Sequence, residues 1–590
     1  MDTQTQLSAT ENGDKAFATS GDACLDFFTR ITRSAPLSDY VDAFTKAWTE
    51  DKETAVRLLM NMRDIRGGKG EKLIPAVLLA YLRFSIPANV YEDILRKMIE
   101  YGYWKDLLRV MEICTRAGLA QSKRAVMDTK PIEVQLFAEQ LKADSLILQN
   151  AGSSTDDKKA AISLCAKWAP SEKTHYDHHP MFFAKNIAVA MGLNQKDYRK
   201  MLSKLRQHLC ILETLMSTQK FDQIDFSKLP SVAMMKMKHA FNRDANADGV
   251  ESDARKALKI SYAAFLQKLR EGKTKVNVKG IQPHELVSTY LNGHGEVDDL
   301  VEGQWSALKE RTKSAGAFRD VTAIVDVSSS MSGQPMEVAI ALGILVAECT
   351  EGPFHGQVLT FHDQPTWHRL VGTNLKEQVQ CLKKAPWGGS TNLRATFDLI
   401  LQQAKSAKLT RDEMVKTLFL FTDMQFNQAN GHHICLGSTS NNDSSNDSSW
   451  ESTFEYAKST FTEAGYELPR IVCWNLRTST SKTMPVQQNE PGFCMLSGFS
   501  AELLKCILTA QEFSPIAMMR HVLEPYEAPA SVKTCSQQLI CPMSLEHLEE
   551  GVTKSAFKKA FKKADAADPS TVPLPDSDGS SSDDGWDSDS

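Results

Sequence analysis

The sequence lacks any apolar run long enough to cross a membrane. Its longest candidate, residues 338–347, is about half the length of the roughly eighteen apolar residues that a membrane helix needs. The first twenty residues have neither the apolar core of a secretory signal nor the arginine-rich face of a transit peptide. These absences argue against a membrane protein, and we expect a cytoplasmic location.

Cysteine is also sparse, and the motifs of common enzymes are missing. The 12 cysteines are scattered through 590 residues without a Cys-x-x-Cys pair, which argues against a zinc ribbon or a redox couple. The GGKG segment at residues 67–70 lacks the spacing of a nucleotide-binding P-loop and follows a helical pattern instead of a strand. No G-x-S-x-G elbow surrounds Ser328. We therefore expect a binding protein and no catalysis.

Three segments are too polar to predict a packed structure. The net charge of −5 is uneven, because residues 565–590 hold eight aspartates and no base. This acidic tail cannot bury enough apolar surface to fold, so we expect it to be disordered. We also expect residues 1–22 to be disordered and residues 432–451 to form a polar insertion.

The chain is too long for one ordinary core, and its first half has a helical pattern. Between residues 23 and 310, apolar residues recur at helical spacing, and alternation typical of strands is almost absent. Leu73, Val77 and Tyr81 form one such apolar face. The pattern predicts an all-helical array similar to HEAT repeats, although no clean sequence period supports a solenoid.

The pattern changes near residue 316. Short apolar runs such as VTAIVDVS and KTLFLFTD alternate with helical stretches, which predicts a doubly wound parallel sheet over residues 318–530. Ligands of such sheets bind beyond the carboxyl ends of the strands. Residues 531–564 are expected to form a C-terminal extension. The predicted fold class is therefore an all-helical module joined to an α/β domain and a disordered acidic tail.

Oxygen-bearing side chains follow two of the predicted strands. Asp326, Ser328 and Ser330 form D-x-S-x-S directly after the first strand, and Asp423 ends the strand LFLFTD. Thr391 follows a glycine turn and precedes a predicted helix. Each element alone is weak evidence, but together they give an oxygen-only set that suits Mg²⁺ or Mn²⁺ better than zinc.

These five residues resemble the coordinating positions of the metal-ion-dependent adhesion site of a von Willebrand factor A domain. In that family the metal keeps an open position, so the resemblance implies a protein partner that supplies a carboxylate. One departure from the family is that Met424, and not glycine, follows the last aspartate.

The helical half contains the segments RDIRGGKGE, YGYWKDLL, KWAPSE and PSVAMMKMKHAF. They resemble a little-characterised family that joins a helical module to a von Willebrand A domain. This architecture is similar to that of the Ro autoantigen and other proteins with a TROVE module, where a ring of HEAT-like helices binds RNA. The resemblance implies a scaffold that binds small structured RNA.

Two basic stretches give independent but limited support for RNA binding. Residues 52–83 hold seven bases and three acids, and residues 255–279 hold eight bases and one acid. Such stretches suit phosphate binding, but they are equally typical of ordinary solvated helix surfaces. A scaffold that binds only protein, through the metal site, is therefore the alternative function. The candidate RNA contacts are Arg63, Arg66, Lys69, Lys72, Arg255, Lys256, Lys259, Lys273 and Lys275.

Overall fold

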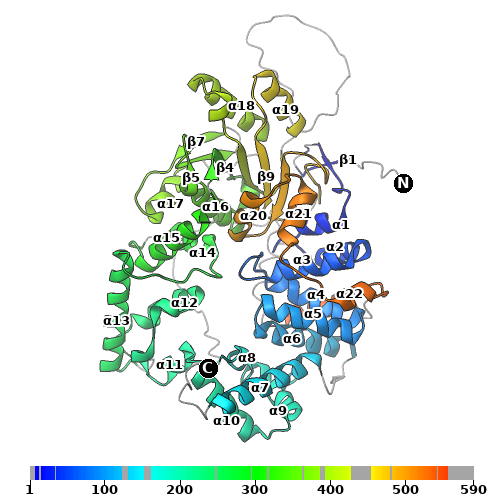
Figure 1. The fold of residues 1–590 in the computed structure, drawn as a ribbon, viewed down its shortest axis with the longest axis vertical. Helices are drawn as coiled ribbons and strands as arrows, with labels where there is room; N and C mark the ends of the chain where they lie inside the picture. The colour runs from blue at the N-terminus through cyan, green and yellow to red at the C-terminus, as the bar shows by residue number, and fades with distance from the viewer. Residues whose placement is uncertain are drawn as a thin grey trace, which may run out of the picture. The chain divides into compact units, whose positions relative to one another are not determined.

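A computed structural model describes most of the chain, which folds into two compact units (Figure 1). Unit 1 comprises residues 1–35 and 281–525, and unit 2 comprises residues 36–280 and 526–590. Within these limits the structure describes residues 7–11, 13, 15–33, 35–122, 131–151, 161–245, 249–293, 295–314, 316, 318–361, 365–385, 392–426, 453–478, 482–540 and 543–555.

Unit 1 contains a six-stranded mixed sheet with the strand order β10-β9-β8-β4-β6-β7. The strands from β10 to β6 in this order run parallel, and β7 at the edge pairs antiparallel with β6. The sheet is therefore not purely parallel, because the chain returns from β6 to β7 by a short connection. Its strands are β4 (Val321–Asp326), β6 (Gln357–Phe361), β7 (Thr366–Arg369), β8 (Thr417–Thr422), β9 (Arg470–Asn475) and β10 (Phe493–Ser497).

Helix α16 (Gln334–Cys349) lies against the centre of this sheet and contacts β4, β6 and β8. Twelve of its 16 residues are buried, as expected for a helix whose middle, residues 338–347, is apolar on every side. Gly343 allows the close approach, because a Cβ atom there would lie 2.5 Å from Cγ2 of Val325 in β4. The helix begins four residues after Ser330, so its packing on the sheet also fixes the end of the D-x-S-x-S segment.

Shorter elements complete unit 1. Strands β3 (Phe318–Arg319) and β5 (Thr350–Glu351) pair in parallel outside the main sheet. Short 3₁₀ turns, η5 (Ser329–Met331) and η6 (Arg411–Glu413), lie in two of the loops. The other helices described after residue 280 are α14 (Pro283–Leu291), α15 (Asp299–Lys313), α17 (Leu375–Lys383), α18 (Leu393–Ala407), α19 (Thr453–Glu463), α20 (Glu502–Thr509) and α21 (Pro515–Leu523).

The N-terminal segment belongs to the sheet unit. Strands β1 (Leu7–Ala9) and β2 (Lys15–Phe17) form an antiparallel pair, and Phe17 bridges to Met484. Residues 1–22 are thus not disordered throughout, and the described ones pair with distant parts of unit 1. The next helix, α1 (Ala23–Arg30), also packs on β10. The expected helical module of residues 23–310 is therefore shorter at both ends, because its first and last helices pack with the sheet.

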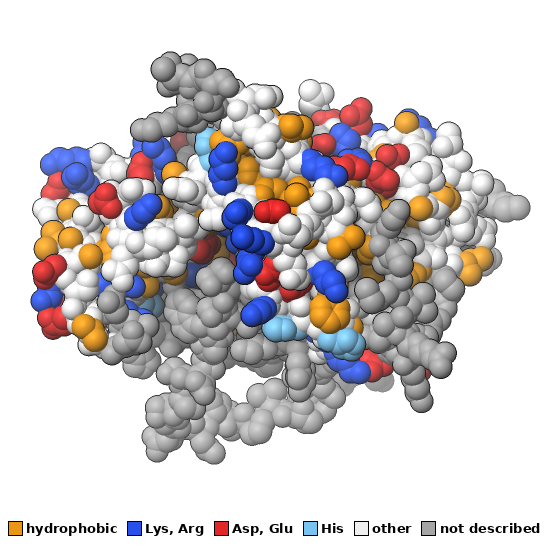
Figure 2. Space-filling model, turned by 90° about the horizontal axis from the view of Figure 1, so that it is seen from below, with side chains coloured by type: hydrophobic (Ala, Val, Ile, Leu, Met, Phe, Trp, Pro, Cys, Tyr) orange, Lys and Arg blue, Asp and Glu red, His pale blue; other side chains and the backbone are white. Residues whose placement is uncertain are grey.

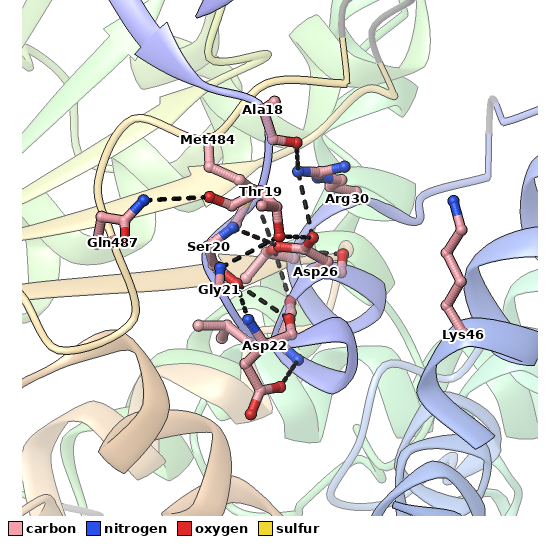
Figure 3. A network of polar contacts seen from close by, with 12 residues as sticks. Ala18, Thr19, Ser20, Gly21, Asp22, Asp26, Arg30, Lys46, Met484 and Gln487 are labelled. Atoms are coloured by element: carbon pink, nitrogen blue, oxygen red, sulfur yellow. Dashed lines mark hydrogen bonds and ion pairs between the residues drawn. The ribbon is translucent and has the colours of Figure 1, made fainter. Parts of the chain in front are cut away.

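Polar contacts fix the entry into α1 (Figure 3). The carboxylate of Asp26 accepts hydrogen bonds from the Thr19 hydroxyl (2.7 Å) and the Ser20 amide (2.9 Å). Arg30 donates to the carbonyl of Ala18, and Gln487 donates to the carbonyl of Thr19 at 3.4 Å. These contacts tie a segment from the start of the chain to a loop near residue 487, which a local sequence pattern cannot reveal.

Unit 2 confirms the expected N-terminal helical array. From α2 to α8 each helix contacts the next one in the chain, and α9 contacts both α7 and α10. Capping residues mark where helices begin. Asp51, for example, accepts hydrogen bonds from the amides of Glu53 and Thr54 at the start of α3. The helices are α2 (Leu37–Glu50), α3 (Lys52–Arg63), α4 (Leu73–Ser85), α5 (Ala88–Tyr101), α6 (Trp104–Ser122), α7 (Ile132–Ala151), α8 (Cys165–Trp168), α9 (Phe183–Met191), α10 (Gln195–His208), α11 (Leu212–Ser217), α12 (Ser231–Phe241) and α13 (Asp253–Arg270).

The C-terminal extension packs on this helical array. Helix α22 (Ala530–Thr534) contacts α3 and α5, and α23 (Leu545–Thr553) contacts α6. The Trp48 indole donates to the carbonyl of Gln537 at 3.3 Å. The extension is therefore part of the core of unit 2, although about 250 residues of unit 1 separate it from α13 in the chain. The expected insertion 432–451 and acidic tail 565–590 lie outside the described residues.

Among the described helices, none combines the length and the apolar character needed to span a bilayer. Lys, Arg, Asp and Glu side chains are intermingled on the face shown in Figure 2. Most of the described cysteines are buried, and all of them are free thiols.

Candidate functional site

The carboxyl ends of β4 and β8 bring two predicted metal ligands to one edge of the sheet. These strands are neighbours and run parallel, with Val325 opposite Phe421. Asp326 is the last residue of β4, and Asp423 directly follows β8. Parallel register therefore places both carboxylates at the edge where ligands of α/β sheets bind.

The D-x-S-x-S segment folds back on its own aspartate. The Ser328 amide donates to Oδ1 of Asp326 at 2.9 Å, and the Ser328 and Ser330 hydroxyl oxygens are 3.0 Å apart. The 3₁₀ turn Ser329–Met331 produces this arrangement, and Gly333 then leads into α16 with φ 85°. The spacing of two residues thus points both hydroxyls to the same side as the carboxylate.

Asp423 completes a contiguous group of oxygens. Its carboxylate accepts a hydrogen bond from the Ser330 side chain and one from the Gln425 amide at 3.2 Å. Met424, which lies between Asp423 and Gln425, has a left-handed backbone with φ 61°, a conformation that glycine adopts at less cost. Although Met424 replaces the glycine of the family pattern, the backbone here still forms the turn that glycine would favour. The structure brings together four of the five predicted ligands.

The two carboxylates are buried with little compensation by positive charge. Asp326 is fully inaccessible and Asp423 is 3% exposed. Burial, and then the charge of Asp423, raise the pKa of Asp326 to about 7. Burial also raises the pKa of Asp423, against the hydrogen bonds from Ser330 and Gln425 and the charge of Arg477. A divalent cation would favour the ionised form of both groups.

Three neighbouring residues were not predicted. The Thr422 hydroxyl donates to Oδ2 of Asp326 at 2.7 Å, and Arg477 donates to the carbonyl of Ser330. Glu11 donates its amide to Oε1 of Gln425 at 2.7 Å, and its negative charge helps to raise the pKa of Asp423. Thr422 and Arg477 lie at the ends of predicted strands, so the sequence could have predicted that they lie at this edge. The sequence gives no signal that would place Glu11 there.

The fifth predicted ligand, Thr391, lies outside the described residues, as do all of residues 386–391. In the described ranges there is no group of three or more His, Cys, Asp or Glu side chains that could hold a metal. The candidate set has only two such residues and relies on hydroxyls. Hard oxygen donors of this kind fit Mg²⁺ or Mn²⁺, and two adjacent buried carboxylates supply the charge that either ion requires.

The glycine-rich loop of unit 2 does not present its backbone to a phosphate. The carboxylate of Asp64 accepts hydrogen bonds from the amides of Arg66 (2.8 Å) and Gly67 (3.2 Å). Gly68 packs so closely that a Cβ atom would lie 2.0 Å from the carbonyl oxygen of Asn61. The loop is therefore an internal turn around an aspartate.

Two of the predicted RNA contacts lie inside unit 2. Arg63 is 1% exposed and donates to Asp106 at 2.6 Å. Lys69 is 2% exposed, and burial lowers its pKa to about 7 against the attraction of Glu71. In this structure neither side chain reaches the surface where a phosphate would bind. The bases of this segment that are exposed are Arg66 and Lys72.

Acids pair with three of the eight bases in the second basic stretch. Lys256 pairs with Glu251, Lys259 with Asp244 and Lys273 with Glu271, each at 2.7 Å. Arg255 is half-buried and lies over the ring of Phe221, 4.9 Å from its centroid. Lys275 is exposed. The sequence count of eight bases against one acid therefore overstates the positive charge, because Glu251 and Asp244 precede the counted segment.

Comparisons with known proteins match both halves of the chain. A family model described as "Domain of unknown function (DUF2828)" matches residues 10–134 and 132–318, and one described as "Domain of unknown function (DUF7788)" matches residues 320–541. "Uncharacterized protein L728" of Acanthamoeba polyphaga mimivirus is 54% identical over 565 residues, which cover 95% of each chain. Neither family description names a von Willebrand A domain or a TROVE module. The chain belongs to the family described as domain of unknown function DUF2828.

Proposed function

We propose that unit 1 is a metal-dependent binding domain that holds Mg²⁺ or Mn²⁺ and captures a carboxylate of a protein partner. The observation that carries this proposal is the contact between four oxygen-bearing side chains at the carboxyl edge of the sheet: Asp326, Ser328, Ser330 and Asp423. The order of these residues along the chain supports the resemblance to a von Willebrand factor A domain. Thr391 would be the fifth ligand.

Each residue has a distinct part in the proposed site. The two serine hydroxyls and the two carboxylates would hold the ion, directly or through water. Thr422 fixes the orientation of the Asp326 carboxylate through its 2.7 Å hydrogen bond. Arg477 fixes the loop by donating to the carbonyl of Ser330. The bound ion would supply an open coordination position for an external carboxylate, and the proposal includes no bond-making step.

Substitution of single loop residues tests this proposal. Asp326→Asn and Ser330→Ala should each weaken Mn²⁺ binding, measured by isothermal titration calorimetry, by about ten-fold or more, because the first removes a negative charge and the second removes a coordinating oxygen. Ser329→Ala is the matched control, since Ser329 is exposed in the same turn and lies outside the donor set. Equal Mn²⁺ affinity in the wild type, Asp326→Asn and Ser329→Ala proteins would refute the site.

The partner can be tested separately from the ion. A partner recovered with the wild-type protein in Mg²⁺ should be lost with EDTA and with Asp326→Asn, and retained with Ser329→Ala. Retention of the same partners by all three proteins in EDTA would show that the site does not capture them, even if Mn²⁺ binds.

RNA binding by unit 2 is a second proposal, which follows from the resemblance to Ro-like proteins. It is supported by the exposed bases Arg66, Lys72 and Lys275. Binding to a structured RNA should weaken steeply between 50 and 200 mM salt, because phosphate contacts release counterions. Absence of any shift in an electrophoretic mobility assay at low salt would refute RNA binding by unit 2.

A further inference from the structure

The helical unit contains a pocket of about 350 Å³ that no predicted site uses. Ser171, Glu172 and Lys173 line it from the loop after α8, and Arg199, Ser203 and Arg206 line it from α10. Because residues 199, 203 and 206 are three or four apart, they lie on one face of the helix. Tyr198 and Leu202 of α10 and Thr214 of α11 complete the lining, so the pocket is built from one loop and two helices of unit 2.

The loop that forms one wall is fixed to α10. Arg206 donates to the carbonyls of Ala166 (2.9 Å) and Ala169 (2.6 Å) and to the Ser171 hydroxyl (2.8 Å). The Tyr198 hydroxyl donates to the carbonyl of Pro170 at 3.0 Å. These bonds hold the wall in one position, so the pocket is preformed and requires little ordering on binding.

The charge of the lining favours an anion. In the part of the chain that the structure describes, Arg206 donates to two carbonyls and a hydroxyl, and it has no ion pair with a carboxylate. Lys173 and Arg199 are exposed at the rim. The one acid of the lining, Glu172, lies 3.4 Å from Nε of Arg199. Three cations and one carboxylate leave an excess of positive charge, which suits a phosphate.

The carboxylate of Glu172 adds a second requirement. Its Oε1 atom is buried and has no hydrogen-bond partner within the described residues. A buried acceptor without a donor costs free energy, so a ligand that supplies a hydroxyl or amino donor would gain affinity there. A simple anion would meet the cations but would leave this oxygen unsatisfied.

We propose that this pocket binds a ribose phosphate, with its phosphate against Arg206, Lys173 and Arg199 and its ribose hydroxyls donating to Glu172. The pocket volume lies at the lower end of the range for small-molecule sites and admits about one nucleotide. The ribose phosphate can come from a free nucleotide or from the end of an RNA chain. The site is independent of the proposed metal centre, because all of its residues belong to unit 2.

Titration calorimetry of the full chain with adenosine monophosphate tests the proposal. We expect Arg199→Ala, Glu172→Gln and Ser203→Trp each to weaken binding by about ten-fold or more, by removing a cation, removing a charged acceptor or filling the pocket. Lys200→Ala is the matched control, because Lys200 is an exposed base on α10 that does not line the pocket. Circular dichroism melts would establish that each variant is folded.

The direction of the Glu172→Gln effect separates a ribose site from a general anion site. If only charge matters, this substitution should strengthen binding of both adenosine monophosphate and inorganic phosphate, and that result would overturn the proposal. Equal affinity of the wild-type protein for these two ligands would overturn it as well.

In the second arm, an RNA oligonucleotide with a 5′-phosphate is compared with the same oligonucleotide ending in a 5′-hydroxyl. A preference for the phosphorylated end would assign the site to RNA termini, and binding of the free nucleotide alone would assign it to a metabolite. If neither ligand binds, the proposal is wrong.

Discussion

At the scale of single residues, the candidate site depends on buried oxygens that neighbouring side chains orient. Thr422 is the best example, since its hydroxyl is inaccessible and donates to a carboxylate that is also inaccessible. The arrangement costs desolvation energy that the hydrogen bond only partly offsets. Such a contact is typical of a functional site, where a charged group must stay in one orientation.

Thr422→Val should destabilise unit 1 by about 1–3 kcal/mol, because it leaves one oxygen of Asp326 without its donor. Urea unfolding in the absence of divalent ions measures this loss. Thr417→Val on the same strand is the control, since Thr417 is only partly buried and no hydrogen bond of its hydroxyl is described. A Thr422→Val variant as stable as Thr417→Val would show that the hydrogen bond does not hold the carboxylate.

His284 should make unit 1 sensitive to acid. Burial, and then the charge of Arg33, lower the pKa of His284 from 6.5 to about 3. Nδ1 of the ring has no hydrogen-bond partner in the described structure, and the ring packs against Phe499. Below pH 6.5 the imidazole of the unfolded chain binds a proton, whereas the buried imidazole of the folded protein does not. The contribution of His284 to the free energy of unfolding is therefore fully present above pH 6.5 and is lost as the pH falls toward 3.

His284→Gln should therefore reduce the slope of stability against pH between 6.5 and 3 by up to about 1.4 kcal/mol per pH unit. The free energy of unfolding in urea, measured at several pH values for both proteins, checks this difference. Parallel curves for the wild type and the variant would mean that the ring can take up a proton while folded.

At the scale of helices and strands, the sequence predicted the type and order of the elements better than it predicted which elements pack together. The strands ending at Asp326 and Asp423 were predicted, and their parallel pairing placed the two carboxylates together. The antiparallel edge strand β7 was not predicted, because its four residues are half-buried or exposed and lack a strong apolar pattern. The burial of Arg63 and Lys69 was also missed, since it depends on Asp106 and on tight turns that helical periodicity does not encode.

Gly343→Ala tests how closely α16 approaches the sheet. The added methyl would collide with Val325, so we expect a loss of about 1–3 kcal/mol in the free energy of unfolding even though alanine favours helices. The double variant Gly343→Ala, Val325→Ala should recover part of this loss, because it removes the colliding methyl groups. A single variant that is more stable than the wild type would show that the helix lies farther from β4.

At the scale of the whole molecule, the chain leaves unit 2 after residue 280 and returns to it after residue 525. Sequence patterns suggested consecutive domains, because periodicity reports on local structure and not on which distant segments pack together. The return segment is anchored by Tyr526, whose hydroxyl donates to Asp64 at 2.9 Å, and by α23 on α6. The segment 526–555 therefore stabilises helices that begin some 480 residues earlier in the chain.

Leu548→Ala in α23 should destabilise unit 2 by about 2–5 kcal/mol, because Leu548 is fully buried. Hydrogen exchange should show faster exchange in α6 than in the wild type and unchanged exchange in β8. Glu546→Ala, at an exposed position of the same helix, is the control. Equal losses of protection in α6 and β8 would mean that the two units unfold as one.

The proposed metal centre is tested most directly by diffraction from crystals soaked in Mn²⁺. An anomalous difference map should show one strong peak about 2.0–2.2 Å from the Ser328 and Ser330 hydroxyl oxygens, beside Asp326 and Asp423, with Thr391 close enough to reach it directly or through water. A map with no peak at this edge of the sheet, or with Thr391 more than about 10 Å from Asp326, would contradict the assignment.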